Sequence, residues 1–337
     1  MHYNKTIIEK EAEEIYKKID FSQLKGKKIL ITGASGIIGI YLTACLKEFS
    51  NNEYIDIHLW IKNEIDLKHK WIFDSCFVFK QDITNISNIE NLQKYDIIIH
   101  AAGYGQPNKF LHDKIKTIEL NTAVTSKLLS LLKPDGKFLF ISTSELYSGN
   151  DSENITEEQI GNTNTNQPRA AYIEGKRCGE AICYSYNNPN IKIARLSLAY
   201  GAGTKPNDDR VLNQLVQKGL TGDNITLMDD GSAIRTYLYI SDCVEMLFNI
   251  LLHGKEQLYN VGGKSKTSIL DLAKLIGSKL KKPVIAPQSQ NALVGNPKIV
   301  NISIDKYIKE FNKTDFVSLE EGITNTIEWQ KQLYGNN

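Results

Sequence analysis

The sequence predicts an α/β protein built on a Rossmann-type, doubly wound parallel sheet with a smaller α/β C-terminal lobe. Three observations support this prediction. Near-continuous apolar runs, typical of strands buried on both faces, alternate with helical patterns over about the first 200 residues. A glycine-rich turn directly follows the first of these runs. After about residue 200 a polar loop, GAGTKPNDDR, and shorter elements indicate a second lobe at the C-terminal edge of the sheet.

The individual elements follow from hydrophobic periodicity and apolar runs. An apolar stripe of Ile8, Ala12, Ile15 and Ile19 predicts an amphipathic helix over 4–19. Apolar runs predict strands at 27–33, 55–61, 76–79, 95–103, 136–142 and 191–198. Helical patterns lie at about 112–132, 170–187, 209–219, 240–253, 268–280 and 318–334, and a strand with a turn is expected at 258–263.

These elements predict three regions along the chain. Residues 1–25 form an N-terminal helical extension, 26–198 a dinucleotide-binding domain, and 199–337 a substrate-binding lobe. We allow for a return of the chain to the dinucleotide-binding domain near 235–262.

Composition excludes several classes of function. The formal net charge is +1 and no long block of one sign occurs, so electrostatics provides no reason to bind nucleic acid or an anionic membrane. No run approaches the ~20 apolar residues of a membrane span, and the charged N-terminus lacks the apolar core of a signal peptide. The five cysteines show no CxxC spacing, which predicts reduced thiols, no metal site and a cytoplasmic protein.

The segment ITGASGIIG (31–39) predicts a dinucleotide-binding loop, because it follows the first sheet strand and opens a helix. Glycines at such positions permit a tight turn and let the backbone approach a pyrophosphate, which the N–H groups of the helix N-terminus then bind. The predicted cofactor contacts in this loop are Gly33, Ser35, Gly36, Ile37, Ile38 and Gly39.

The end of the second strand normally distinguishes NAD from NADP, since an acidic residue there binds the ribose hydroxyls of NAD. Lys62 and Asn63 occupy this place. A lysine could contact the 2′-phosphate of NADP, or it could simply be a solvated residue at a strand end. The residues at this strand end therefore do not distinguish NAD from NADP.

Further candidate cofactor contacts follow the next two strands. Asp82 and Ile83 come after the third strand, where a carboxylate can reach the adenine amino group. The fourth strand ends in a histidine followed by Ala101, Ala102 and Gly103, small residues where a cofactor must pass closely. The carboxyl ends of parallel strands share one edge of the sheet, so these residues are expected to meet there. Asn121, in the following helix, is a further candidate.

Tyr172 and Lys176 form a YxxxK pair on a predicted helix, where residues four apart share a face. A free tyrosine has a pKa of about 10, and a nearby cation favours its ionised form. The segment ISTSELY (141–147) closes the fifth strand and places Thr143, Ser144 and Glu145 at the same edge of the sheet. A hydroxyl there can share a proton with Tyr172, so these five residues are the predicted catalytic set.

Together, TGASGIIG, HAAG, STSELY and YIEGK make the chain resemble the extended short-chain dehydrogenase/reductase superfamily, in its nucleotide-sugar epimerase and dehydratase branch, over about residues 25–330. The resemblance implies a Ser/Thr-Tyr-Lys triad, here Thr143, Tyr172 and Lys176, and a nucleotide-diphosphate sugar as substrate. It also implies a homodimer through helices near 112–132 and 170–187. We expect NAD, with NADP not excluded, because an enzyme that reduces its own oxidised intermediate benefits from retaining an oxidised cofactor.

The resemblance is strongest to UDP-glucuronate decarboxylases, in the segments 106–122, 168–186, 207–211 and 234–242. Oxidation at C4 of the sugar would then make a β-keto acid, which loses carbon dioxide readily. Ser144 and Glu145 would position the carboxylate, and Arg210 and Arg235 would hold the diphosphate or the sugar. An ion pair at the surface or between the domains is the alternative role for these arginines.

Other reactions remain as alternatives. A 4,6-dehydratase usually carries Asp-Glu where this chain has Ser144-Glu145, although GDP-mannose 4,6-dehydratases show a similar T-S-E-L-Y segment. A 4-epimerase is the third reaction, and a non-catalytic dinucleotide-binding regulator is a remote alternative, because such proteins usually lose the tyrosine or the lysine. Leu198, where many relatives have a diphosphate-binding asparagine, and Lys62 indicate a divergent subgroup with an unusual substrate.

Overall fold

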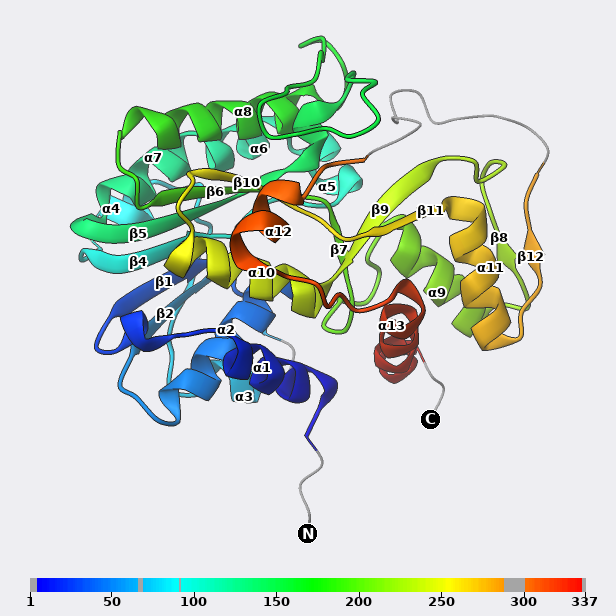
Figure 1. The fold of residues 1–337 in the computed structure, drawn as a ribbon, viewed down its shortest axis with the longest axis horizontal. Helices are drawn as coiled ribbons and strands as arrows, with labels where there is room; N and C mark the ends of the chain where they lie inside the picture. The colour runs from blue at the N-terminus through cyan, green and yellow to red at the C-terminus, as the bar shows by residue number, and fades with distance from the viewer. Residues whose placement is uncertain (1–4, 66–68, 91, 288–300, 335–337) are drawn as a thin grey trace.

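The computed structural model describes residues 5–65, 69–90, 92–287 and 301–334, and its centre is a seven-stranded parallel sheet (Figure 1). The strands are β1 (Lys28–Thr32), β2 (Asp56–Ile61), β3 (Phe77–Lys80), β4 (Tyr95–His100), β5 (Leu132–Thr143), β6 (Ile191–Leu196) and β10 (Leu258–Val261). Their spatial order is β10-β6-β5-β4-β1-β2-β3. The order reverses between β1 and β4, and ligands of open α/β sheets bind in the crevice at such a point. The predicted Rossmann-type fold is confirmed.

Helices cover both faces of this sheet (Figure 1). One face carries α1 (Ile7–Lys18), α2 (Ile37–Ser50), α3 (Lys70–Phe73) and α10 (Ile240–His253). The other carries α4 (Ser87–Glu90), α6 (Lys114–Asn121), α7 (Ala123–Ser130) and α8 (Ala170–Ser185). The strands are buried between the two layers, which explains why their sequences are almost continuously apolar.

The second lobe contains two small sheets. One has the order β11-β9-β7 and the other pairs β12 with β8. These strands are β7 (Leu198–Tyr200), β8 (Ile225–Thr226), β9 (Ile234–Tyr239), β11 (Ser265–Ser268) and β12 (Val284–Ile285). The accompanying helices are α9 (Val211–Thr221), α11 (Ile269–Leu280) and α13 (Leu319–Tyr334), whereas α12 (Asp305–Phe311) packs on β10 of the large sheet. Between β9 and β11 the chain returns to the large sheet, where α10 packs on α2 and β10 pairs with β6.

Several predicted elements are wrong in extent, among them the strands expected over 95–103 and 136–142, which are Tyr95–His100 and Leu132–Thr143. The helix expected over 112–132 is interrupted at Thr122 (φ −115°, ψ −80°), which separates α6 from α7. It is also separated at Asp113 from a short preceding helix, α5 (Pro107–His112). The hydroxyl of Thr122 hydrogen-bonds back to Ile118 O, an arrangement that often bends helices. The strand expected over 191–198 ends at Leu196, because β7 leaves the large sheet to pair with β9.

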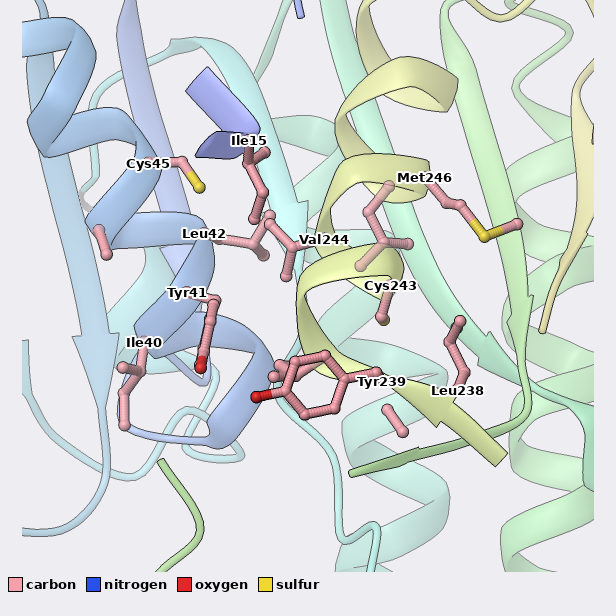
Figure 2. Packing of buried hydrophobic residues seen from close by; sticks show 14 of the residues in the cluster. Ile15, Ile40, Tyr41, Leu42, Cys45, Leu238, Tyr239, Cys243, Val244 and Met246 are labelled. Carbon is pink, nitrogen blue, oxygen red and sulfur yellow. The ribbon is translucent and has the colours of Figure 1, made fainter. Parts of the chain in front are cut away.

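The N-terminal helix α1 ties the two lobes together. A capping box starts it, since Thr6 accepts a hydrogen bond from Glu9 N and donates its own N–H to the Glu9 carboxylate. The buried carboxylate of Glu11 accepts hydrogen bonds from Tyr41 on α2 (2.6 Å) and from Tyr239 at the end of β9 (2.7 Å). Figure 2 shows both tyrosines within the packed layer between α2 and α10.

Within the described part of the chain, no helix is both long and apolar enough to cross a membrane.

Candidate active site

The glycine loop lies between β1 and α2 at the point where the strand order reverses. Gly33 has φ +70°, and a Cβ there would lie 2.7 Å from Ala101 O and from the Ala102 backbone. A Cβ on Gly39 would collide with Gly33 O and the Ala34 backbone. Gly36 is the N-cap of α2, so the first N–H groups of that helix are available to an anion. The three glycines therefore form a cradle that a side chain at Gly33 or Gly39 would fill, and Ser35, Ile37 and Ile38 in the same loop and helix start are partly exposed.

A buried hydrogen-bond network joins this loop to the end of β4. The His100 ring bonds through Nε2 to Leu120 O (3.1 Å) and through Nδ1 to the Thr32 hydroxyl (2.8 Å). The Leu120 carbonyl can only accept, so Nε2 carries the proton and Nδ1 accepts from Thr32. The Thr32 oxygen in turn accepts from Ala102 N–H (3.2 Å). Burial, assisted by the charge of Lys176, lowers the pKa of His100 to about 3, so the ring stays neutral and holds the Ala101–Gly103 segment in place.

Two of the predicted cofactor contacts bind each other. Lys62 lies at the end of β2, and its ammonium is 2.9 Å from the carboxylate of Asp82, after β3. It also donates to the hydroxyl of Tyr104 (3.2 Å). Burial alone would raise the pKa of Asp82, but hydrogen bonds from Lys62 and Thr84 outweigh it and lower the pKa to about 2. Asn63 beside this pair is exposed, whereas the side chain of Ile83 is buried.

Tyr172 lies in the first turn of α8 and is buried against the end of β5. Burial and the negative charge of Glu145 raise its pKa, whereas a hydrogen bond with Thr143 and the positive charge of Arg169 lower it. Thr143 is the last residue of β5, and its hydroxyl also accepts a hydrogen bond from Glu145 N (3.2 Å). Ser144 follows it, buried in the 3₁₀ turn of residues Ser144–Tyr147.

Lys176 lies one helical turn beyond Tyr172 and is fully enclosed. Its ammonium donates to Ile141 O (2.6 Å) and lies 4.7 Å from the centre of the Phe140 ring. Burial lowers its pKa to about 7, although the charge of Glu180 opposes this shift. The charge of Lys176 therefore acts beside β5 and close to His100, whereas the charges that act on the pKa of Tyr172 are those of Glu145 and Arg169.

Asn121 lies at the end of α6, where α6 and α8 approach closely. Its side-chain amide donates to Thr117 O (2.7 Å). A Cβ on Gly175 of α8 would lie 3.6 Å from the Asn121 side chain, so the two helices meet at this residue. The asparagine is completely buried next to the helix that carries the YxxxK pair.

Arg169 and Phe110 are parts of the site that the sequence analysis missed. Arg169 forms a bidentate ion pair with Glu145, from Nε to Oε2 (2.9 Å) and from Nη2 to Oε1 (2.5 Å). Its guanidinium lies 5.0 Å from the ring centre of Phe110. The Phe110 ring stacks on Tyr172 with 4.6 Å between centroids and 7° between planes. The position of Arg169, three residues before Tyr172 on the same helical face, was the available signal.

The two predicted substrate-binding arginines have different surroundings. Arg210 forms a bidentate ion pair with the buried Asp208 and donates to Ala199 O (3.3 Å). Arg235 lies on β9, where burial lowers its pKa; Arg169 lowers it further, and Glu145 raises it. The structure thus brings Arg235 to the catalytic set and engages Arg210 with its own loop. Leu198, on β7, exposes 40% of its surface.

Among the described residues, no cluster of three or more histidine, cysteine, aspartate or glutamate side chains could hold a metal ion.

Comparison with known protein families shows to which family the chain belongs. The model of the NAD dependent epimerase/dehydratase family matches residues 29–262, from β1 to the end of β10. The chain belongs to this family. The matched region includes the glycine cradle, Thr143, Tyr172 and Lys176.

Relatives and solved structures narrow the resemblance. The chain is 29% identical over 316 residues to UDP-glucuronic acid decarboxylase 1 of Danio rerio, covering 91% of this chain and 73% of that protein. It is 30% identical over 274 residues to UDP-glucuronic acid decarboxylase 5 of Arabidopsis thaliana, covering 80% and 78%. The structure of UDP-glucuronic acid 4-epimerase from Bacillus cereus, in complex with UDP-glucuronic acid and NAD, superimposes with a TM-score of 0.76 at 27% identity. That match covers 91% of this chain and 100% of the epimerase.

Proposed function

We propose that this protein is an NAD-dependent decarboxylase of a UDP-glucuronate-like nucleotide sugar. The observation that carries the proposal is a pair of guanidinium groups near Tyr172, because Arg169 binds Glu145 and the buried Arg235 lies within electrostatic reach of both. Guanidinium groups recognise carboxylates through paired hydrogen bonds, which suits a substrate with a carboxylate on its sugar ring. The similarity to UDP-glucuronic acid decarboxylases supports the same substrate class.

The glycine cradle fits a dinucleotide. The space that a Cβ would fill at Gly33 and Gly39, and the uncapped N-terminus of α2, suit a pyrophosphate. Lys62 and Asp82 would lie toward the adenosine end, and Lys176 and Tyr172 toward the nicotinamide end. When bound, NAD supplies the acceptor for the hydride that leaves C4 of the sugar.

The chain's own residues then manage protons and charge. Tyr172 accepts the proton of the C4 hydroxyl, and Thr143 shares that proton through its hydrogen bond. The C4 ketone lies β to the carboxylate, so carbon dioxide leaves while the electrons of the C5–C6 bond pass into the ketone system. C5 then takes a proton from solvent, and Tyr172 returns its proton to the C4 oxygen as the hydride removed at the start comes back to C4. Arg235 and Ser144 orient the carboxylate before it leaves.

A 4-epimerase acting on the same uronate is the second candidate, because of the similarity to the Bacillus cereus epimerase. The two reactions share oxidation at C4 and differ in whether the carboxylate is retained. A 4,6-dehydratase is less well supported, since both oxygens of Glu145 accept hydrogen bonds from Arg169 and neither is placed as a proton donor.

The mass of the reaction product distinguishes these reactions from one another. The purified protein is incubated separately with UDP-glucuronate, UDP-glucose, GDP-mannose, dTDP-glucose and CDP-glucose. We expect the wild-type protein to release carbon dioxide from UDP-glucuronate, and we expect Tyr172→Phe to convert none of the five sugar nucleotides. An unchanged mass with a new retention time would identify an epimerase, and loss of water a dehydratase. Turnover that survives in Tyr172→Phe would refute the mechanism, and no turnover of any sugar nucleotide would favour a regulatory dinucleotide-binding protein.

We also propose a homodimer through α6 and α8. Large apolar or aromatic side chains are exposed on or beside these helices, at Ile115, Ile118, Tyr184 and Tyr186. Surfaces of this kind mark association sites. Light scattering should give twice the mass of the chain, and Ile115→Glu should reduce it to one chain. The five free cysteines support a reducing, cytoplasmic location, which fractionation of the source cells would test.

A further inference from the structure

A continuous set of contacts connects Glu145 with Tyr172. The guanidinium of Arg169 binds both oxygens of Glu145 along its edge and covers the Phe110 ring with its face. The Phe110 ring also stacks on the parallel ring of Tyr172. Arg169 directly precedes α8, and its carbonyl accepts the N–H of Tyr172 (3.1 Å). The arginine is therefore coupled to both residues, although it belongs to neither of the sequence motifs that contain them.

Arg169 joins Tyr172 and Glu145, and the negative charge of Glu145 opposes ionisation of Tyr172. Tyr172 must give up its proton to act as a base, and a nearby negative charge opposes this. Glu145 supplies such a charge, which adds to the effect of burial in raising the pKa of Tyr172. The Thr143 hydrogen bond and the charge of Arg169 act in the opposite direction. A carboxylate next to the base is thus tolerable only when a cation offsets it.

We propose that Arg169 is a positioning residue that neutralises Glu145 and fixes its orientation, so that a carboxylate and a tyrosine base can work side by side. This inference rests on the proposed role of Tyr172 as the base, and it does not depend on the identity of the sugar. A guanidinium suits the task, because its planar fork matches a carboxylate while its face stacks on an aromatic ring. A lysine would retain the charge without the fork or the stack.

Other charged groups surround Tyr172 and must be considered with Arg169. Lys176 on α8 directs its ammonium to Ile141 O. Arg235 on β9 lies within the electrostatic reach of Arg169 and Glu145. The helix α5, which supplies Phe110, also carries Lys109 and His112. Arg169 differs from these groups because it binds Glu145 through both carboxylate oxygens.

The test is a double-mutant cycle on the titration of Tyr172 in the NAD-bound protein. The variants are Arg169→Met, Glu145→Gln and the two together, each measured against a matched protein that also carries Tyr172→Phe. Subtracting the ultraviolet spectra isolates the Tyr172 phenolate from the other tyrosines. We expect the midpoint to rise in Arg169→Met, to fall in Glu145→Gln, and to return toward the wild-type value in the double variant. At neutral pH, C4 oxidation in Arg169→Met should be roughly tenfold slower or more, in line with the raised midpoint.

Arg177 provides the matched control. It lies on the same helix, pairs with Glu174 (2.8 Å) and donates to Leu146 O and Gly161 O. Arg177→Met should lower the unfolding temperature and leave the Tyr172 midpoint unchanged. If Arg169→Met does not fold, Arg169→Lys replaces it. That variant should keep a midpoint near the wild-type value while turnover falls, because the charge remains and the orientation of Glu145 is lost.

Three results would overturn the inference. The first is a folded Arg169→Met protein with the wild-type midpoint, and the second is an Arg169→Lys protein with normal turnover. The third is a double variant whose midpoint equals that of Arg169→Met, since this would show that Glu145 does not act on Tyr172. The titration requires no sugar, so an incorrect substrate assignment would appear as failed turnover of UDP-glucuronate with the cycle intact.

Discussion

Lys176 permits a stability test whose sign changes with pH. Its pKa falls from 10.5 to about 7 because the ammonium is buried. That drop corresponds to a penalty of ~5 kcal/mol on the charged form in the folded protein. Between pH 7 and 10.5 the unfolded chain holds this proton and the folded protein releases it, so the contribution of Lys176 to stability rises with pH across this window. Below pH 7 the penalty is fully present.

Lys176→Met removes the charge but leaves Ile141 O without its donor. A buried acceptor without a partner costs ~1–3 kcal/mol, so below neutral pH the variant should be more stable than the wild type by roughly 2–4 kcal/mol. Near pH 10.5 the penalty on the wild type has disappeared, and the variant should be the less stable protein. The free energy of unfolding of both proteins, stripped of cofactor, is measured in urea from pH about 6 to about 10.

The half-exposed Lys331, on α13, provides the control, because its methionine variant should show no reversal of sign. A difference between wild type and Lys176→Met that is independent of pH would refute the argument. A variant less stable than the wild type below neutral pH would refute it as well, since burial of the ammonium would then carry no penalty.

Three further predictions concern the cofactor loop and the N-terminal helix. Gly39→Ala should lower the free energy of unfolding by about 1–3 kcal/mol and weaken NAD binding, because the new Cβ meets loop backbone; undiminished calorimetric binding of NAD would contradict this. Lys62→Asp should shift the ratio of NADP affinity to NAD affinity roughly tenfold toward NAD, because it places a second carboxylate beside Asp82. An unchanged ratio would show that the adenosine ribose lies elsewhere. Glu11→Leu should lower the free energy of unfolding in urea by ~2–4 kcal/mol, because it leaves two buried tyrosine hydroxyls without an acceptor. Glu11→Gln should lower it much less at neutral pH, and equal losses of stability in the two variants would contradict this.

Much of the fold follows from local sequence. The near-continuous apolar runs required a sheet covered on both faces, and α10 has the bounds that its periodicity predicts. Gly33, Gly36 and Gly39 indicated the loop, and at Gly33 and Gly39 a side chain would collide with its backbone. The order of motifs along the chain placed Thr143, Tyr172 and Lys176 at one sheet edge, since parallel strands end together. The break at Thr122 was less accessible, because it depends on a side chain bonding back to its own helix.

Only the tertiary structure determined which charged side chains of the site pair with one another. The sequence places Lys62 where an acidic residue is usual, but only the adjacency of β2 and β3 brings it to Asp82. The sequence contains Arg169 and Glu145 in separate segments, and only the meeting of the end of β5 with the start of α8 pairs them. Electrostatic effects depend on distance and burial, which a one-dimensional pattern does not specify. The sequence alone therefore determined the fold class and the proposed catalytic triad, whereas the packing of strand ends against α8 determined which charges act on Tyr172.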